Sequence, residues 1–214
     1  MRNYLISLSR AGTKMVGMYF ILSFSSCLIF LTSCSEENTT EDEFANWQER
    51  NEEKTGQWAA NANNGTYQKI LTFTKDDSTP GLVNSDYIYY EVLQRGEGTE
   101  SPIYTDTVRV AYRGRFIPTK NYSEGYVFDQ TYLGDFDWQT ANMTDMTASA
   151  LVNGFTTAVM NMHVGDCWRV YIPYQLGYGT TATNSIPGYS NLTFDIALKA
   201  FWHPGDKMEK FKSR

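Results

Sequence analysis

The sequence has few of the residues that catalytic and metal sites commonly use. Its 214 residues include two histidines, His163 and His203, and three cysteines, Cys27, Cys34 and Cys167. Neither histidine stands at a metal-ligand spacing from the other or from Cys167, so we expect no metal site and no cofactor. A glycine-rich phosphate loop and a Gly-x-Ser-x-Gly element are also absent from the sequence.

Basic residues are in the minority. The chain has 18 lysines and arginines against 24 aspartates and glutamates, a formal net charge of −6 at pH 7. Three of the basic residues, Arg2, Arg10 and Lys14, lie at the very N-terminus, so the remainder is more acidic still. Because nucleic-acid binding needs a basic surface, we expect no nucleic-acid partner.

The N-terminus has the layout of a secretory signal. Residues 1–14 are basic, residues 15–32 form an apolar run, and the LTSC that ends at Cys34 resembles a bacterial lipobox. We expect residues 1–33 to be a lipoprotein signal peptide and Cys34 to be lipidated, which would anchor the protein to the outer membrane of a bacterial envelope, at its periplasmic face or at the cell surface. An uncleaved transmembrane anchor is the alternative, since roughly 20 apolar residues span a bilayer.

The next segments differ from a domain core in composition. Residues 34–43 are polar and acidic and predict a solvated tether. Residues 44–81 predict a helix and a linker, because Phe44, Trp47 and Trp58 stand at helical spacing. The default for such an aromatic stripe is packing onto the domain; a homodimer through residues 44–60 and a grip on unfolded clients are the alternatives.

From residue 82 to residue 203 the pattern predicts one α+β domain, followed by a tail over residues 204–214. Apolar residues alternate with wetter ones around residues 108–112, 168–172 and 192–198, as in an antiparallel sheet with its core on one side. One short helix interrupts them, with Phe155 and Val159 on its apolar face, Asn153 as N-cap and Gly165 beyond its end. We expect the antiparallel sheet to wrap around this short α-helix.

Cys167 lies in one of the alternating segments, so we expect it to be packed rather than nucleophilic. Removal of Cys27 and lipidation of Cys34 would leave it without an intramolecular disulfide partner.

Six elements in order resemble the FKBP-type peptidyl-prolyl cis-trans isomerases. They are VAYRG at 110–114, VFDQT at 127–131, LVNGF at 151–155, MHVG at 162–165, IPYQLGYG at 172–179, and the pair IP at 186–187 and LTFDI at 192–196. The resemblance implies the FKBP-like fold and rotation of prolyl amide bonds in proline-containing polypeptides. A non-catalytic binding module or holdase of the envelope is the alternative function.

The resemblance also implies a site. Phe155 would be its floor, the N–H of Val152 and the hydroxyl of Tyr178 would bind carbonyl oxygens beside the prolyl bond, and Asp129 would hydrogen-bond Tyr112. The implied catalytic residues are Tyr112, Phe128, Asp129, Val152, Phe155, Tyr178 and Phe194, and the implied substrate-binding residues are Leu151, Ile186 and Met146.

The sequence departs from small members of the family in three places. Residues 115–127 contain an insertion, residues 132–147 are longer, and the loop 180–185 is about one residue short. We expect these changes to affect substrate choice more than the fold.

Overall fold

A computed structural model describes residues 43–209, which belong to one compact unit. The expected signal peptide, the lipidation site Cys34 and nearly all of the acidic tether lie outside the described residues. Within residues 43–209, no helix has both the length and the apolar character needed to cross a membrane. In the same range, no three side chains of the His, Cys, Asp and Glu types gather as metal ligands.

Seven strands form one sheet, in which every pairing is antiparallel. Their spatial order is β1-β2-β6-β7-β3-β4, and β5 pairs with another part of β3. The strands are β1 (Gln68–Leu71), β2 (Tyr87–Gln94), β3 (Thr107–Arg115), β4 (Val127–Gln130), β5 (Thr144–Thr147), β6 (Cys167–Ile172) and β7 (Leu192–Trp202). The sheet thus begins with β1, earlier in the chain than the domain boundary at residue 82 that the sequence suggests.

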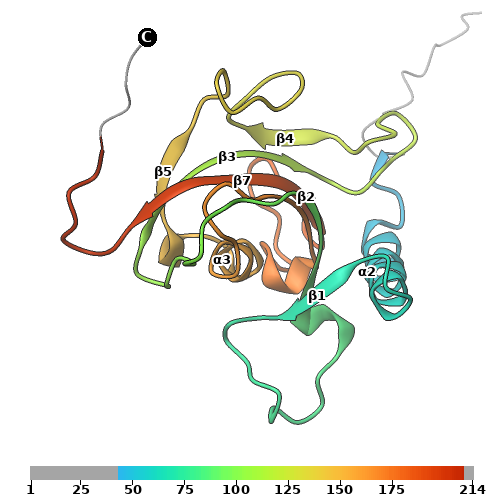
Figure 1. Cartoon of the computed structure of the whole chain (residues 1–214). Helices are drawn as coiled ribbons and strands as arrows, with labels where there is room; N and C mark the ends of the chain where they lie inside the picture. The colour runs from blue at the N-terminus through green and yellow to red at the C-terminus, as the bar shows by residue number, and fades with distance from the viewer. Residues whose placement is uncertain (1–42, 210–214) are drawn as a thin grey trace, which may run out of the picture. The chain divides into compact units, whose positions relative to one another are not determined.

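The short helix α3 (Asn153–Val159) lies inside the curve of the sheet, as Figure 1 shows. It packs tightly on β6: a Cβ added to Gly154 would lie 2.3 Å from Cγ2 of Ile172. The main core fills the space between helix and sheet, and its fully buried members include Val108, Val170 and Ile196. The α+β fold with an antiparallel sheet around one short helix is therefore confirmed.

The N-cap of α3 differs by one residue from the prediction. Val152, whose backbone is extended at φ −63° and ψ 146°, precedes the helix, and Asn153 is already helical. The Val152 carbonyl accepts the first helical hydrogen bond from the N–H of Thr156 at 3.0 Å. No side chain caps this end of the helix. Asparagine is favoured at the N-cap position, but Asn153 lies one residue past it.

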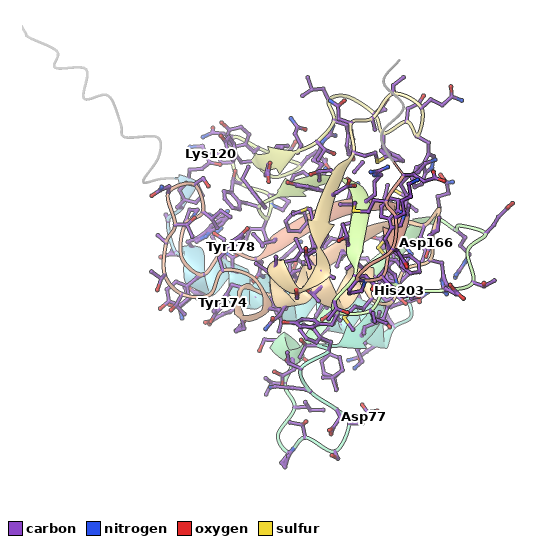
Figure 2. All side chains as sticks on the ribbon, turned by 90° about the vertical axis from the view of Figure 1, so that its left-hand side faces the viewer. Asp77, Lys120, Asp166, Tyr174, Tyr178 and His203 are labelled. Carbon is purple, nitrogen blue, oxygen red and sulfur yellow. The ribbon has the colours of Figure 1, made fainter. Side chains whose placement is uncertain are left out.

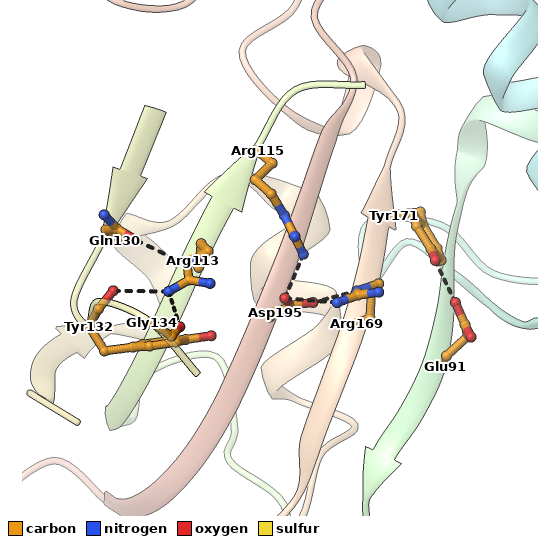
Figure 3. Close-up of polar contacts among 9 residues, drawn as sticks. All are labelled: Glu91, Arg113, Arg115, Gln130, Tyr132, Gly134, Arg169, Tyr171 and Asp195. Carbon is orange, nitrogen blue, oxygen red and sulfur yellow. Dashed lines mark hydrogen bonds and ion pairs between the residues drawn. The ribbon is translucent and has the colours of Figure 1, made fainter. Parts of the chain in front are cut away.

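The outer face of the sheet is held by a buried ion-pair group, drawn in Figure 3. Asp195 on β7 accepts hydrogen bonds from Arg115 Nη2 on β3 at 2.5 Å and from Arg169 Nε on β6 at 2.6 Å. The bond to Asp195 raises the pKa of the Arg169 guanidinium. One carboxylate thus ties three neighbouring strands together.

The same outer face buries Cys167 beneath the loop after β4. Cys167 packs with Ala111 and Ala197 under the rings of Tyr132 and Phe136. Burial raises the pKa of its thiol to about 11, so the thiolate is scarce near neutral pH. The prediction that Cys167 is packed is confirmed.

Helix α2 (Trp47–Asn63) packs back onto the sheet near β1 (Figure 1). Trp47 and Trp58 are 7% and 2% exposed, and the Trp58 ring lies 5.3 Å from that of Tyr171 on β6. The default interpretation of the aromatic stripe is therefore confirmed. These two rings are not on the surface, so they offer no contact to a second copy of the chain.

Glu43 is also buried, although the sequence assigns it to the tether. It is 7% exposed, and its carboxylate accepts hydrogen bonds from Thr119 and Asn121 in the insertion after β3. Its carbonyl accepts a further hydrogen bond from Arg50 at 2.9 Å. The acidic composition of residues 34–43 does not predict these partners, because Thr119 and Asn121 lie far away in the sequence.

Two buried asparagines lock α2 onto the start of β7. The N–H of Asn191 donates to Asn51 Oδ1 at 2.8 Å, and Asn191 Nδ2 donates to the Asn51 carbonyl at 2.7 Å. Asn191 Oδ1 accepts the N–H of Tyr174 at 2.9 Å. Both asparagines are 0% exposed, so these bonds have no competition from water.

Replacing Asn51 by alanine tests this lock. Asn51→Ala leaves the buried N–H of Asn191 without its acceptor, and we expect a loss of about 1–3 kcal/mol in the free energy of unfolding. Asn63→Ala, at the exposed last residue of the same helix, is the control and should change it by less than about 0.5 kcal/mol. Urea unfolding followed by circular dichroism measures both, and equal values for the two variants would contradict the lock.

Candidate functional site

Three strands bring aromatic rings together over one glycine. Gly114 on β3 pairs with Phe194 on β7, and Phe128 comes from β4 on the other side. A Cβ at residue 114 would lie 2.6 Å from Phe128 Cζ and 2.6 Å from Phe194 Cε1. Both rings therefore lie directly over Gly114 and require its lack of a side chain. From the sequence alone, Gly114 has no predicted role beyond its place in the VAYRG motif.

The ring of Phe194 is the centre of the aromatic cluster. Its centroid lies 5.1 Å from that of Phe155, 5.6 Å from that of Phe128 and 6.0 Å from that of Tyr112, each with steep interplanar angles. Such edge-to-face contacts are the favoured geometry for aromatic pairs. Phe155 is 4% exposed and lies on α3, so it forms the deepest part of the cluster, as the resemblance implies.

Tyr112 and Asp129 form the predicted hydrogen bond. The Tyr112 hydroxyl donates to Asp129 Oδ2 at 2.6 Å. Burial of the ring and the bond to Asp129 both raise the pKa of the Tyr112 phenol. Because Asp129 itself is exposed, this pair lies at the boundary between the aromatic cluster and water.

Tyr178 lies on the loop that follows β6 and is labelled in Figure 2. Two backbone hydrogen bonds of Gly179 close the loop. Its N–H donates to the Tyr174 carbonyl at 2.9 Å, and its carbonyl accepts from the N–H of Tyr189 at 2.9 Å. Desolvation and the nearby carboxylate of Asp129 raise the pKa of Tyr178. Within residues 43–209 its hydroxyl has no hydrogen-bond partner, so it is available to a ligand.

The backbone N–H of Val152 is available in the same way. The Val152 carbonyl caps α3, but no acceptor among the described residues takes its N–H. Val152 is half-buried and packs against the main core. Two unpaired donors, one from the backbone and one from a side chain, thus belong to residues that the resemblance assigns to the carbonyls beside the prolyl bond.

The three remaining predicted residues lie around the cluster at different depths. Leu151 directly precedes Val152 and is half-buried against the main core. Met146 lies on β5 opposite Val108 of β3. Ile186 is 5% exposed and lies in the loop before β7.

A cavity of about 660 Å³ lies beside the aromatic cluster. Of the ten predicted site residues, only Ile186 lines it. Its wall includes Phe116, whose ring stacks on that of Phe128 at 5.0 Å between centroids. Sequence reasoning missed Phe116, because it lies in the insertion, where the resemblance has no counterpart for it.

A comparison with protein-family models decides the family of this region. The model described as "FKBP-type peptidyl-prolyl cis-trans isomerase" matches residues 98–199. Residues 98–199 are an FKBP-type domain. All ten residues that the resemblance assigns to the site lie within this range.

Known relatives agree with this result over part of their length. The chain is 33% identical over 112 residues to the "Macrophage infectivity potentiator" of Trypanosoma cruzi, covering 52% of this chain and 51% of the relative. It is 31% identical over 123 residues to the "Outer membrane protein MIP" of Legionella longbeachae, covering 56% and 47%. The chain thus spans about half the length of these curated relatives.

A solved structure shows the same fold. The crystal structure of FkpA from Escherichia coli matches with a TM-score of 0.52 at 24% sequence identity, covering 73% of this chain and 61% of that one. The match supports the FKBP-like arrangement of sheet and helix around the aromatic cluster.

Removing the Asp129 carboxylate should change the titration of Tyr112. A free tyrosine is half-ionised near pH 10, whereas the raised pKa keeps Tyr112 protonated there. In Asp129→Asn we expect a lower pKa for Tyr112 than in the wild type, yet one still above the ordinary value because burial persists. The ¹³Cζ shifts of labelled tyrosine, assigned with Tyr112→Phe, measure this; an unchanged pKa would mean that the hydrogen bond is absent in solution.

Proposed function

We propose that this protein is a peptidyl-prolyl cis-trans isomerase that acts on proline-containing polypeptides. The observation that carries the proposal is the pair of unpaired donors, the Val152 N–H and the Tyr178 hydroxyl, beside an aromatic cluster in an FKBP-type domain. Such a set can hold an amide by its flanking carbonyls without any bond being broken.

The reaction itself explains why the cluster is mostly apolar. Rotation about a prolyl amide crosses a barrier of about 18–20 kcal/mol, because resonance is lost in the twisted state. The twisted amide has lost much of the charge separation of the planar form, so an apolar surface favours it relative to water. Phe128, Phe155 and Phe194 supply that surface.

The polar groups of the site orient the substrate. The Val152 N–H and the Tyr178 hydroxyl bind the carbonyl oxygens on either side of the rotating bond. The hydrogen bond to Asp129 fixes the phenol of Tyr112 against the edge of the cluster. Catalysis is then differential binding of one conformation, for which neither a nucleophile nor a metal ion is needed.

A non-catalytic holdase has less support. That alternative uses the aromatic stripe of the N-terminal helix to grip clients, but Trp47 and Trp58 are buried against the domain. These two rings therefore offer no binding surface, and a holdase would have to bind clients through a widened cleft of the domain instead.

The location we propose is the bacterial envelope, with a lipid anchor at Cys34. The signal layout of residues 1–34 supports it. The name of the Legionella longbeachae relative, "Outer membrane protein MIP", agrees with an envelope location. In that compartment the clients would be exported or surface polypeptides.

A protease-free isomerisation assay tests the activity. We expect the whole chain in lipid nanodiscs to accelerate cis-trans exchange of a short proline peptide, and tacrolimus or rapamycin to inhibit it, as the family resemblance implies. Tyr178→Phe removes one donor and Asp129→Val removes the acceptor of Tyr112. Each should lower kcat/KM roughly threefold to tenfold, the effect of losing one hydrogen bond.

The matched control is Tyr104→Phe, because Tyr104 and Tyr178 are 44% and 45% exposed and Tyr104 packs instead on Phe73. It should retain the wild-type rate. Wild-type rates in both Tyr178→Phe and Asp129→Val, with circular dichroism unchanged, would remove the assignment of these residues. No turnover by the wild type would remove the activity.

Inhibition of the lipoprotein signal peptidase tests the anchor. We expect globomycin to cause a larger precursor to accumulate, and Cys34→Ser to prevent incorporation of labelled palmitate. Cys167→Ser is the control and should be processed normally, since Cys167 is buried in the folded domain. A single full-length form both with and without globomycin would favour the uncleaved transmembrane anchor instead.

A further inference from the structure

The cavity beside the aromatic cluster is built by three segments that lie far apart in the sequence. Glu43 and Phe44 come from the start of the described chain, and Phe116, Tyr122 and Tyr126 come from the insertion after β3. The third wall is the loop 182–187 before β7. The cavity encloses about 660 Å³, which is within the range of small-molecule and side-chain binding sites.

Hydrogen bonds fix these walls in the free protein. The Glu43 carboxylate accepts from Thr119 and Asn121, which joins the first wall to the second. The N–H of Phe116 donates to the Tyr126 carbonyl at 3.1 Å and closes the inserted hairpin. In the third wall the N–H of Ile186 donates to Thr183 Oγ1 at 3.1 Å. The cavity is thus preformed.

Its lining suits an apolar ring rather than a charged group. Phe44, Phe116, Tyr122 and Tyr126 surround it, and most of the lining surface is apolar. Among residues 43–209, Glu43 is the only charged residue in the lining, and its carboxylate already has two donors. A side chain inserted here would gain aromatic contacts without displacing those bonds.

The cavity lies next to the proposed prolyl site. Ile186 belongs to both, and Phe116 is a wall of the cavity that stacks on Phe128 at 5.0 Å. Phe128 in turn lies 5.6 Å from Phe194 at the centre of the cluster. An extended chain advances about 3.3–3.6 Å per residue, so these two ring-to-ring steps correspond to about three residues.

We propose that this cavity is an accessory subsite that binds an aromatic or large aliphatic side chain of the polypeptide substrate, two or three residues from the proline. The inference rests on the proposed isomerase function and adds a sequence preference to it. The protein would then recognise two residues of the substrate, the proline in the prolyl site and one apolar residue in the cavity. Because the subsite is preformed, occupying it adds affinity with little ordering cost.

The test uses the whole chain in lipid nanodiscs and a set of alanine-rich peptides with one proline. In each, a single phenylalanine stands two or three residues before or after the proline, and a reference peptide has none. The measured quantity is the ratio of kcat/KM with and without phenylalanine, from protease-free exchange rates. At one or more positions we expect a ratio of about 10 or more in the wild type, the discrimination that an apolar pocket provides.

Two opposite changes to the cavity should abolish this preference. Tyr126→Ala removes part of a wall and Ala182→Trp fills the space, and both should bring the ratio close to one. Tyr104→Ala is the matched control, because Tyr104 and Tyr126 are both 44% exposed and Tyr104 does not line the cavity. It should keep the wild-type ratio, and circular dichroism checks that all three variants fold.

The outcomes separate the two proposals. A wild type that turns over the reference peptide but shows a ratio near one at every position overturns the subsite and leaves the isomerase intact. A preference that survives both Tyr126→Ala and Ala182→Trp also overturns the subsite, because it would arise elsewhere. A wild type without activity on any peptide overturns the isomerase, and the subsite with it.

Discussion

The approach of Phe128 and Phe194 over Gly114 is the contact on which the rest of the site depends. A side chain at Gly114 would meet both rings at 2.6 Å, so the two phenylalanines could not share this position over β3. Phe194 is also the ring that touches Phe155 below and Tyr112 beside it. The Tyr112 hydroxyl then holds Asp129 at the rim. The absence of a side chain at Gly114 thus allows three strands and one helix to contribute to a single aromatic cluster.

The donors of the site are maintained by a different constraint. An N–H left without a partner is costly when it is fully buried, but Val152 is only half-buried. Water can therefore satisfy it in the free protein, as it can the hydroxyl of the exposed Tyr178. In the proposed site, a substrate carbonyl that replaced this water would meet a donor that is already in position. The stability of the fold is preserved, and binding gains preorganised hydrogen bonds.

Local patterns in the sequence predicted the elements that depend on local physics. The alternation of apolar and polar residues around 168–172 and 192–198 predicted β6 and β7. The helical spacing of Phe155 and Val159 predicted α3. The choice of site residues needed the family resemblance, because a ring such as Phe194 has the same pattern in a core as in a site. The pairing of β1 with β2 in the sheet depends on contacts that no local pattern encodes.

The least predictable residue was Glu43. As the last member of an acidic run it has the composition of a solvated tether, and only the distant Thr119 and Asn121 make its burial favourable. The cavity could not be predicted from the sequence either. Its walls come from the N-terminal segment, the insertion after β3 and the loop before β7, which lie far apart along the chain. Long-range polar contacts of this kind are what a single sequence shows least.

The N-terminal segment therefore contributes to the FKBP-type domain even though the family match begins at residue 98. Trp47 Nε1 donates to Ser190 Oγ at 2.9 Å, and Ser190 Oγ donates to the carbonyl of Pro187 at 2.7 Å. This relay connects α2 to the loop that carries Ile186, next to both the prolyl site and the cavity. The hydrogen bond from the Asn191 N–H to Asn51 holds α2 against the start of β7, one residue after Ser190. The helix therefore stabilises the loop that precedes β7. Helix α2 thus supports the loop that carries Ile186, which lines the cavity.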